Sequence, residues 1–208
     1  MDIQHFPHRF IQGDSQAEAP NLLLLHGTGG SEHDLIPLAQ QISPGSALLS
    51  PRGQVSEQGA ARFFKRFAEG VLDIDDWRRR SAELVEWLEV AKASYEWSDQ
   101  PLYALGYSNG ANIALGLLLL HPESIAGAAL LRPMWITDDL PEHDLSGRKV
   151  LLLSGAEDPI IKSADASRLD AQLSALGASV VTHQHEGVGH QLVRRDLELA
   201  SNWLKNER

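Results

Sequence analysis

Gly106-Tyr107-Ser108-Asn109-Gly110 is a G-x-S-x-G pentapeptide, a pattern that can surround a nucleophilic serine. The apolar run over residues 101–105 predicts a buried strand before it, and residues 111–120 predict a buried helix after it. A tight turn between a strand and a helix strains the serine backbone, so glycines must flank the serine. The Ser108 hydroxyl then projects at a helix N-terminus, where developing negative charge is favoured. Ser108 is therefore the candidate nucleophile.

A serine nucleophile needs a base to accept its proton and an acidic side chain to orient that base. In a strand–turn–helix site of this kind, the acid and then the histidine follow the serine along the chain. Asp158 lies in the loop after the apolar run 149–153, and His190 lies in the glycine-rich loop after residues 179–183. Each of the two separations leaves room for a strand and a helix. The predicted triad is Ser108, Asp158 and His190.

Three neighbouring side chains compete for these roles. Glu157 precedes Asp158 directly, but Pro159 fixes the backbone just past Asp158 and favours it as the acid. His183 and His185 stand inside the strand-like segment, where no loop frees the imidazole ring. Alternating strand residues share one face, so these two histidines suggest a metal, yet the sequence offers no clear third ligand. No metal site is predicted.

The tetrahedral intermediate of acyl transfer carries a negative oxygen, which backbone amides can stabilise. One donor is the amide after the nucleophile, here that of Asn109, and a second comes from a loop after an early strand. The segment His26-Gly27-Thr28-Gly29-Gly30 follows the apolar run 22–25 directly, so Thr28 is the expected second donor. His26 is expected to be structural, with its ring packed or hydrogen-bonded below this loop.

Strand-like and helix-like segments alternate along the whole chain, which predicts an α/β fold with a doubly wound, mostly parallel sheet flanked by helices. A continuous apolar run such as residues 22–25 is typical of a parallel strand buried on both faces. Asp75 or Asp76 is expected to cap the helix that begins near Trp77. The expected strands are 8–13 (an edge), 22–25, 47–49, 101–105, 125–131, 149–153 and 179–183, and the expected helices include 35–42, 111–120, 164–176 and 192–204.

Composition limits the class of protein. A chain of 208 residues with 43% hydrophobic residues predicts a single domain over residues 1–208. The formal charge of −10 disfavours nucleic acid and anionic membranes as partners, and no segment is apolar and long enough to insert in a bilayer. The absence of cysteine excludes disulfides and a cysteine nucleophile. A cytoplasmic protein without a cofactor or a signal peptide is expected.

Taken together, the serine, acid, histidine and oxyanion segments resemble those of an α/β-hydrolase. The chain is similar to the small phospholipase/carboxylesterase family, which also contains the acyl-protein thioesterases, from about residue 22 to residue 204. The resemblance implies the same catalytic triad and the same two oxyanion donors. The segment Ala61-Arg62-Phe63-Phe64-Lys65-Arg66 also resembles the bacterial carboxylesterase branch, in which this stretch lies on a loop near the active site.

Segment lengths indicate the kind of substrate. Only residues 134–148 separate two expected strands at the place where large α/β-hydrolases insert a lid, which is too short for a cap domain. An open groove shaped by residues 52–76 suits carboxylic esters with short or medium acyl chains, or with aryl alcohols. The candidate substrate-binding residues are Arg62, Phe63, Met134 and Trp135, with Arg62 suited to a polar or anionic acyl group. The alternative for Arg62 and Phe63 is a partly exposed loop cluster without a role in binding.

Other functions share these features. An acyl thioesterase or a lysophospholipase of the same fold would use the same acyl-enzyme. Enzymes of the dienelactone type normally place cysteine at the nucleophile, which this chain lacks. A non-catalytic binding protein on a hydrolase fold has no need of an intact triad. A small-molecule ester is the expected partner, and the sequence leaves a homodimer open.

Overall fold

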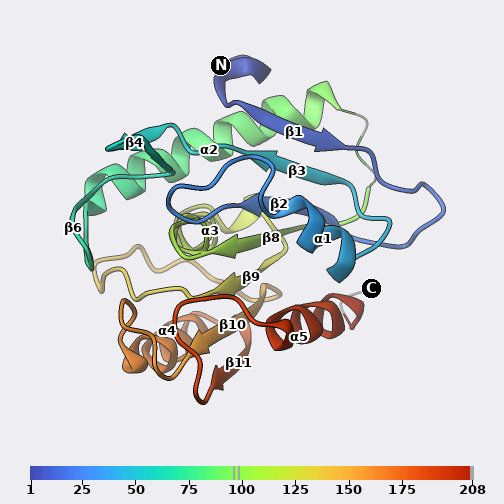
Figure 1. Cartoon of the computed structure of the whole chain (residues 1–208). Coiled ribbons are helices and arrows are strands. Elements are labelled where there is room, and N and C mark those ends of the chain that lie inside the picture. Colours follow the sequence, from blue (N-terminus) through green and yellow to red (C-terminus); the bar gives the residue numbers. More distant parts are fainter. Residues whose placement is uncertain (96, 98, 207–208) are drawn as a thin grey trace.

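A mostly parallel sheet of seven strands forms the centre of the computed structural model, which describes residues 1–95, 97 and 99–206 (Figure 1). Strand β1 pairs antiparallel with β3 at one edge, and every other neighbouring pair in this sheet is parallel. This arrangement confirms the predicted fold class. In spatial order the strands are β1 (His8–Ile11), β3 (Leu48–Pro51), β2 (Asn21–Leu25), β8 (Leu102–Tyr107), β9 (Gly127–Leu131), β10 (Lys149–Gly155) and β11 (Ser179–His185).

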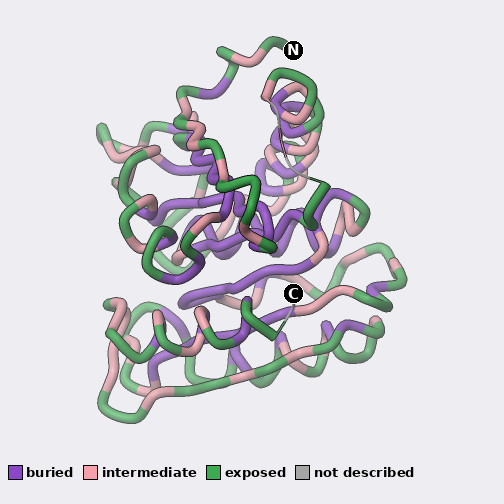
Figure 2. The backbone as a smooth tube through the Cα atoms, turned by 90° about the vertical axis from the view of Figure 1, so that its right-hand side faces the viewer, coloured by how far each residue is buried: buried purple, intermediate pink, exposed green. Residues whose placement is uncertain are grey.

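Helices cover both faces of the sheet. Helices α1 (Ile36–Ile42) and α5 (Arg194–Lys205) pack on one face, and α2 (Ile74–Ser94), α3 (Asn109–Leu120) and α4 (Ser163–Ala175) pack on the other. Successive side chains of a strand point to opposite faces, so Leu22 and Leu24 join one core while Leu23 and Leu25 join the other. Burial on both sides explains the unbroken leucine run, and Figure 2 shows the buried stretches gathered in the middle of the molecule.

Helix α3 is buried along almost its whole length and lies close to α2. A Cβ atom on Gly116 would lie 2.0 Å from Ser81 Oγ and 3.0 Å from Ser81 Cβ, so a side chain at this position would displace Ser81. The buried indole of Trp77 donates from Nε1 to the carbonyl of Asn112 at 2.8 Å, which satisfies its polar atom inside the core. The site serine therefore stands at the start of a firmly held helix.

Two helix starts differ from the sequence-based expectation. Helix α2 begins at Ile74, and its N-cap is Asp73, whose side chain accepts from the amide of Asp76 at 3.0 Å. The prediction of Asp75 or Asp76 as the cap is wrong, because both lie inside the first turn, where a carboxylate also complements the helix dipole. Helix α5 begins at Arg194 rather than near Leu192.

Two small hairpins, which the sequence did not predict, stand between β3 and α2. Strands β4 (Val55–Glu57) and β5 (Ala60–Arg62) form one hairpin, and β6 (Arg66–Ala68) and β7 (Val71–Leu72) form the other. Gln58 and Gly59 connect β4 to β5 with φ of 52° and 88°, as a two-residue type I′ turn requires. Strands of two or three residues are too short to show an alternating pattern, so the sequence predicts a loop in this segment.

The chain between β9 and β10, residues 132–148, contains no helix or strand, which agrees with the expected lack of a cap domain. Across residues 1–95, 97 and 99–206, no helix has both the length and the apolar character needed to span a bilayer.

Candidate active site

Ser108 lies in a sharp turn between β8 and α3. Its backbone has φ of 53° and ψ of −113°, a conformation that is strained for any residue with a side chain. A Cβ atom on Gly106 would lie 2.5 Å from the Gly110 carbonyl oxygen, and one on Gly110 would lie 1.9 Å from that of Leu25. The two glycines of the pentapeptide are therefore required by close backbone contacts, and the turn leaves the Ser108 hydroxyl free to face a pocket.

The structure brings the three predicted triad residues together. His190 Nε2 lies 2.9 Å from Ser108 Oγ, and His190 Nδ1 lies 2.8 Å from Asp158 Oδ2. The Asp158 carboxylate is 1% exposed, and its Oδ1 accepts from the amides of Ile160 at 2.8 Å and Ile161 at 3.0 Å. A buried, fully bonded carboxylate can hold the imidazole in one orientation and stabilise its protonated form.

The competing side chains lie elsewhere. Glu157 is exposed, and His183 is exposed on the edge strand β11. His185 Nε2 bonds to Asp196 Oδ1 at 3.0 Å, and His185 does not line the pocket that holds Ser108. Within the described ranges, no three His, Cys, Asp or Glu side chains are placed to hold a metal ion.

Arg132 supports the histidine loop, a role that its local sequence does not predict. Its fully buried guanidinium donates to the carbonyl oxygens of Gly189 at 3.2 Å and Gln191 at 2.8 Å, on either side of His190. It also forms a bidentate ion pair with buried Asp196, at 3.1 and 2.8 Å. The only sequence signal is a charged residue directly after a buried strand, which does not reveal its partner.

Thr28 and Asn109 both line the pocket that holds Ser108. Asn109 is the first residue of α3, and Thr28 lies in the loop after β2. In the part of the chain that the structure describes, neither amide donates to a backbone carbonyl, although Gly29 and Gly30 beside Thr28 both do. Two uncommitted amides next to a nucleophile are suited to an oxyanion, as the sequence predicts.

His26 is buried below the Thr28 loop, at 2% exposure. Its Nδ1 lies 2.7 Å from the Gly27 carbonyl oxygen, and its Nε2 accepts from the Gly53 amide at 3.0 Å. This pair of bonds requires the neutral ring with its proton on Nδ1. Burial lowers the pKa of His26, although the Gly27 carbonyl and nearby carboxylates partly oppose that effect.

We expect His26 to make stability depend on pH. Its pKa is lower in the folded chain than in the unfolded chain, so its contribution is complete above the ordinary histidine pKa of about 6.5 and is lost as pH falls toward the lowered folded value. Thermal melting between neutral and mildly acid pH should therefore fall more steeply for the natural protein than for His26→Gln, whose amide does not titrate. Equal slopes for the two proteins would show that His26 contributes nothing.

The pocket at Ser108 has a volume of about 290 Å³. Of the predicted substrate contacts, Arg62 and Met134 line it, whereas Phe63 and Trp135 do not. Phe63 is 3% exposed and packs on His26 with ring centroids 4.7 Å apart, so its prediction as a pocket residue is wrong. The sequence placed Phe63 in an open loop, but the first hairpin turns its ring into the core.

Trp135 lines an adjacent pocket of about 440 Å³. The two pockets share Gly70, Leu72, Met134 and Ile160 as walls, so they form neighbouring parts of one groove. A larger hollow of about 680 Å³ lies at the amino ends of strands such as β2 and β8, and no triad residue lines it. The position of the triad, rather than volume, identifies the candidate site.

The model of the dienelactone hydrolase family matches residues 53–205. The chain belongs to the dienelactone hydrolase family. It is 40% identical to the "Putative hydrolase MhqD" of Bacillus subtilis (strain 168), with 88% of this chain and 92% of that protein covered.

Solved structures of carboxylesterases have the same fold as this member of the dienelactone hydrolase family. The Bacillus cereus carboxylesterase is 39% identical, with 98% of this chain and 95% of that chain covered and a TM-score of 0.93. A carboxylesterase from Mesorhizobium loti is 32% identical, with 96% and 94% covered and a TM-score of 0.89. These similarities confirm the α/β-hydrolase resemblance and a hydrolase enzyme with a carboxylesterase-like fold. Ser108 differs from the cysteine that dienelactone-type enzymes normally use.

Proposed function

We propose that the protein is a serine carboxylesterase that acts through an acyl-enzyme on Ser108. The unbroken hydrogen-bond chain from Ser108 through His190 to Asp158 carries this proposal. His190 Nε2 accepts the hydroxyl proton while Ser108 Oγ attacks the ester carbonyl carbon, and the resulting oxyanion faces the amides of Thr28 and Asn109. His190 then protonates the departing alcohol. Water then attacks the acyl carbon while His190 takes one of its protons. His190 returns that proton to Ser108 Oγ as the bond from the acyl carbon to Oγ breaks and the acid leaves.

The groove supports small esters as the partner. The apolar walls of the Ser108 pocket are formed by Leu72, Met134, Ile160 and Ile161. The pocket volume of about 290 Å³ suits a short or medium acyl chain. The neighbouring pocket is lined by Trp135, one face of which is covered by the Arg168 guanidinium 3.5 Å from the ring centre, and by apolar side chains that suit an alkyl or aryl alcohol. A thioester enters by the same path, because the two reactions differ only in the leaving group.

A panel of acetate, butyrate and longer esters, each with a matched thioester, tests the substrate class. We expect ester turnover to decline for long acyl chains, together with labelling of Ser108 by a fluorophosphonate. A protein that only binds ligands has no activated serine, so absence of labelling in the natural protein would contradict the proposal.

Met134 and Phe63 should respond differently to truncation. Met134→Ala should lower kcat/KM for butyrate or bulky aryl esters by about tenfold and spare acetate, because part of an apolar contact worth about 1.5–3 kcal/mol disappears. Met134→Leu preserves most of the volume and serves as the matched control. Phe63→Ala should instead lower the free energy of unfolding by about 3–5 kcal/mol and leave the relative rates across the panel unchanged. A selectivity change in Phe63→Ala alone would reverse this assignment.

A further inference from the structure

The segment from Ala61 to Phe63 contacts the surroundings of both candidate oxyanion donors. The Arg62 guanidinium donates from Nη1 to Thr28 Oγ1, and the Phe63 amide donates to Asn109 Oδ1 at 2.7 Å. The Ala61 carbonyl oxygen accepts from the Gly29 amide at 2.9 Å, one residue past Thr28. Three consecutive residues thus bond to the two separate segments that supply the amides, the Thr28 loop and the start of α3.

Arg62 is more deeply placed than a surface clamp for an anionic substrate. Its side chain is 4% exposed, and its Nε donates to the Phe64 carbonyl oxygen at 3.1 Å. Burial, together with the charge of nearby Arg66, lowers the pKa of Arg62, and Glu57 at 3.3 Å opposes that effect. Glu57 also pairs with Arg66 at 2.9 Å, so one partly exposed carboxylate serves two guanidinium groups. The Arg62 guanidinium thus lies beside Thr28 as one of two cations that share the Glu57 carboxylate.

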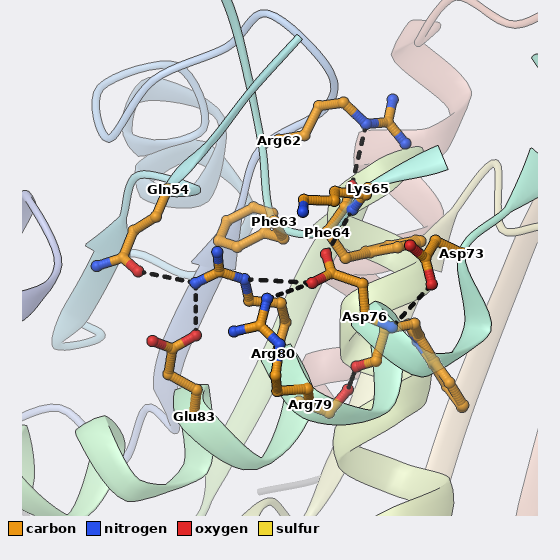
Figure 3. A network of polar contacts seen from close by, with 12 residues as sticks. Gln54, Arg62, Phe63, Phe64, Lys65, Asp73, Asp76, Arg79, Arg80 and Glu83 are labelled. Carbon is orange, nitrogen blue, oxygen red and sulfur yellow. Dashed lines mark hydrogen bonds and ion pairs between the residues drawn. The ribbon is translucent and has the colours of Figure 1, made fainter. Parts of the chain in front are cut away.

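The same segment is anchored to α2 at its other end. The Lys65 amide donates to Asp76 Oδ2 at 2.8 Å, and Asp76 is 6% exposed. Figure 3 shows Asp76 between this amide and the guanidinium groups of Arg79 and Arg80, while the Arg62 side chain extends away from them. Residues 62–65 are thus held at both ends, by a long helix and by the candidate oxyanion loops.

We propose that Arg62 is a positioning residue of the oxyanion hole. Its bond to Thr28 Oγ1 fixes the Thr28 main chain, so that the Thr28 amide points at the oxyanion, and its charge favours the negative oxygen as it develops. The hydrogen bond from the Lys65 amide to Asp76 on α2 holds residues 62–65, and with them the Arg62–Thr28 bond, in place. The inference rests on the proposed esterase function. Because the oxyanion exists only in the transition state and the tetrahedral intermediate, the effect belongs to kcat rather than to KM.

Arg62→Met and Thr28→Val remove the two ends of the same bond and give the test. For an acetate ester, each variant should lower kcat by about 10- to 100-fold while KM changes little. This fall in kcat is smaller than the fall caused by removing a direct oxyanion donor. The affinity for a trifluoromethyl ketone should fall by a similar factor, because Ser108 adds to its carbonyl carbon and leaves an oxyanion in the same place. The double variant should lose no more than Arg62→Met alone, because Arg62→Met already removes both the bond to Thr28 and the charge.

Matched controls separate positioning from folding. Thr28→Ser keeps the hydroxyl acceptor and should retain most of kcat. Lys92→Gln removes a partly exposed cation near the other end of α2, where it pairs with Glu89 and does not line the Ser108 pocket, and it should match the natural protein. Melting temperature is measured for every variant, and Thr28→Val tests the bond even where Arg62→Met folds poorly.

Several results overturn the inference. An increase in KM with an unchanged kcat in Arg62→Met would make Arg62 a substrate contact, and fully additive losses would show that Arg62 and Thr28 act separately. A lower melting temperature with unchanged kcat per folded molecule would leave Arg62 a structural role only. Failure of the proposed function itself is distinct, since the natural protein would then lack esterase turnover and fluorophosphonate labelling.

Discussion

Ser108→Ala is expected to lower ester kcat by roughly 10⁶-fold, as loss of a triad nucleophile does in serine hydrolases. The substitution removes the only atom of Ser108 that bonds to His190, and the acyl-enzyme cannot form without it. Steady-state hydrolysis of an acetate ester measures the loss. Stability should change by no more than about 0.5 kcal/mol, because the hydroxyl fills little volume and the backbone strain remains.

Fluorophosphonate labelling is the companion measurement for Ser108→Ala. The natural protein should be labelled and the variant should not. Turnover by the variant at more than a small fraction of the natural rate, after contaminating esterases are removed, would contradict the triad. Intact protein mass after reaction with the fluorophosphonate also identifies the number of modified residues.

His190→Ala should be nearly as damaging, with kcat lower by roughly 10⁶-fold, and Asp158→Asn should cost about 10⁴-fold. His190 is the one ring within hydrogen-bonding distance of Ser108 among the described residues, and Asp158 is the partner of its other ring nitrogen. The asparagine keeps the shape of Asp158 but favours the wrong imidazole tautomer. The rates of both variants are measured on the same acetate ester.

His183→Ala is the matched control for His190→Ala, because His183 is exposed and should leave kcat unchanged. His185→Ala should retain kcat but lower the melting temperature, because it removes the hydrogen bond to buried Asp196. Loss of turnover in His183→Ala, with turnover kept in His190→Ala, would reject His190 as the base.

Strong local patterns were predictable from the sequence. The leucine run in β2 and the apolar run of α3 are long enough to predict a strand and a helix from the local sequence alone. Both elements appear where the sequence predicts them. The order of serine, acid and histidine follows from the chain order of the sheet strands. The cap of α2 was less predictable, because several aspartates within a few residues can each accept from an early amide.

Partners far apart in the sequence were not predictable. Arg132 and Asp196 are separated by 64 residues, and nothing in either local segment indicates the other. Phe63 is a second case, because nothing in its local segment indicates that its ring packs on His26.

The sequence by itself determined the sheet, the serine turn and the three candidate catalytic residues, because each depends on periodicity, on glycine requirements and on loops after strands. Only the tertiary structure decided that Arg62 bonds to Thr28, that Phe63 packs on His26 and that Arg132 holds the His190 loop. Local sequence encodes backbone preference and the alternation of buried and exposed faces. The direction of a long side chain is decided by groups that folding brings from elsewhere in the chain.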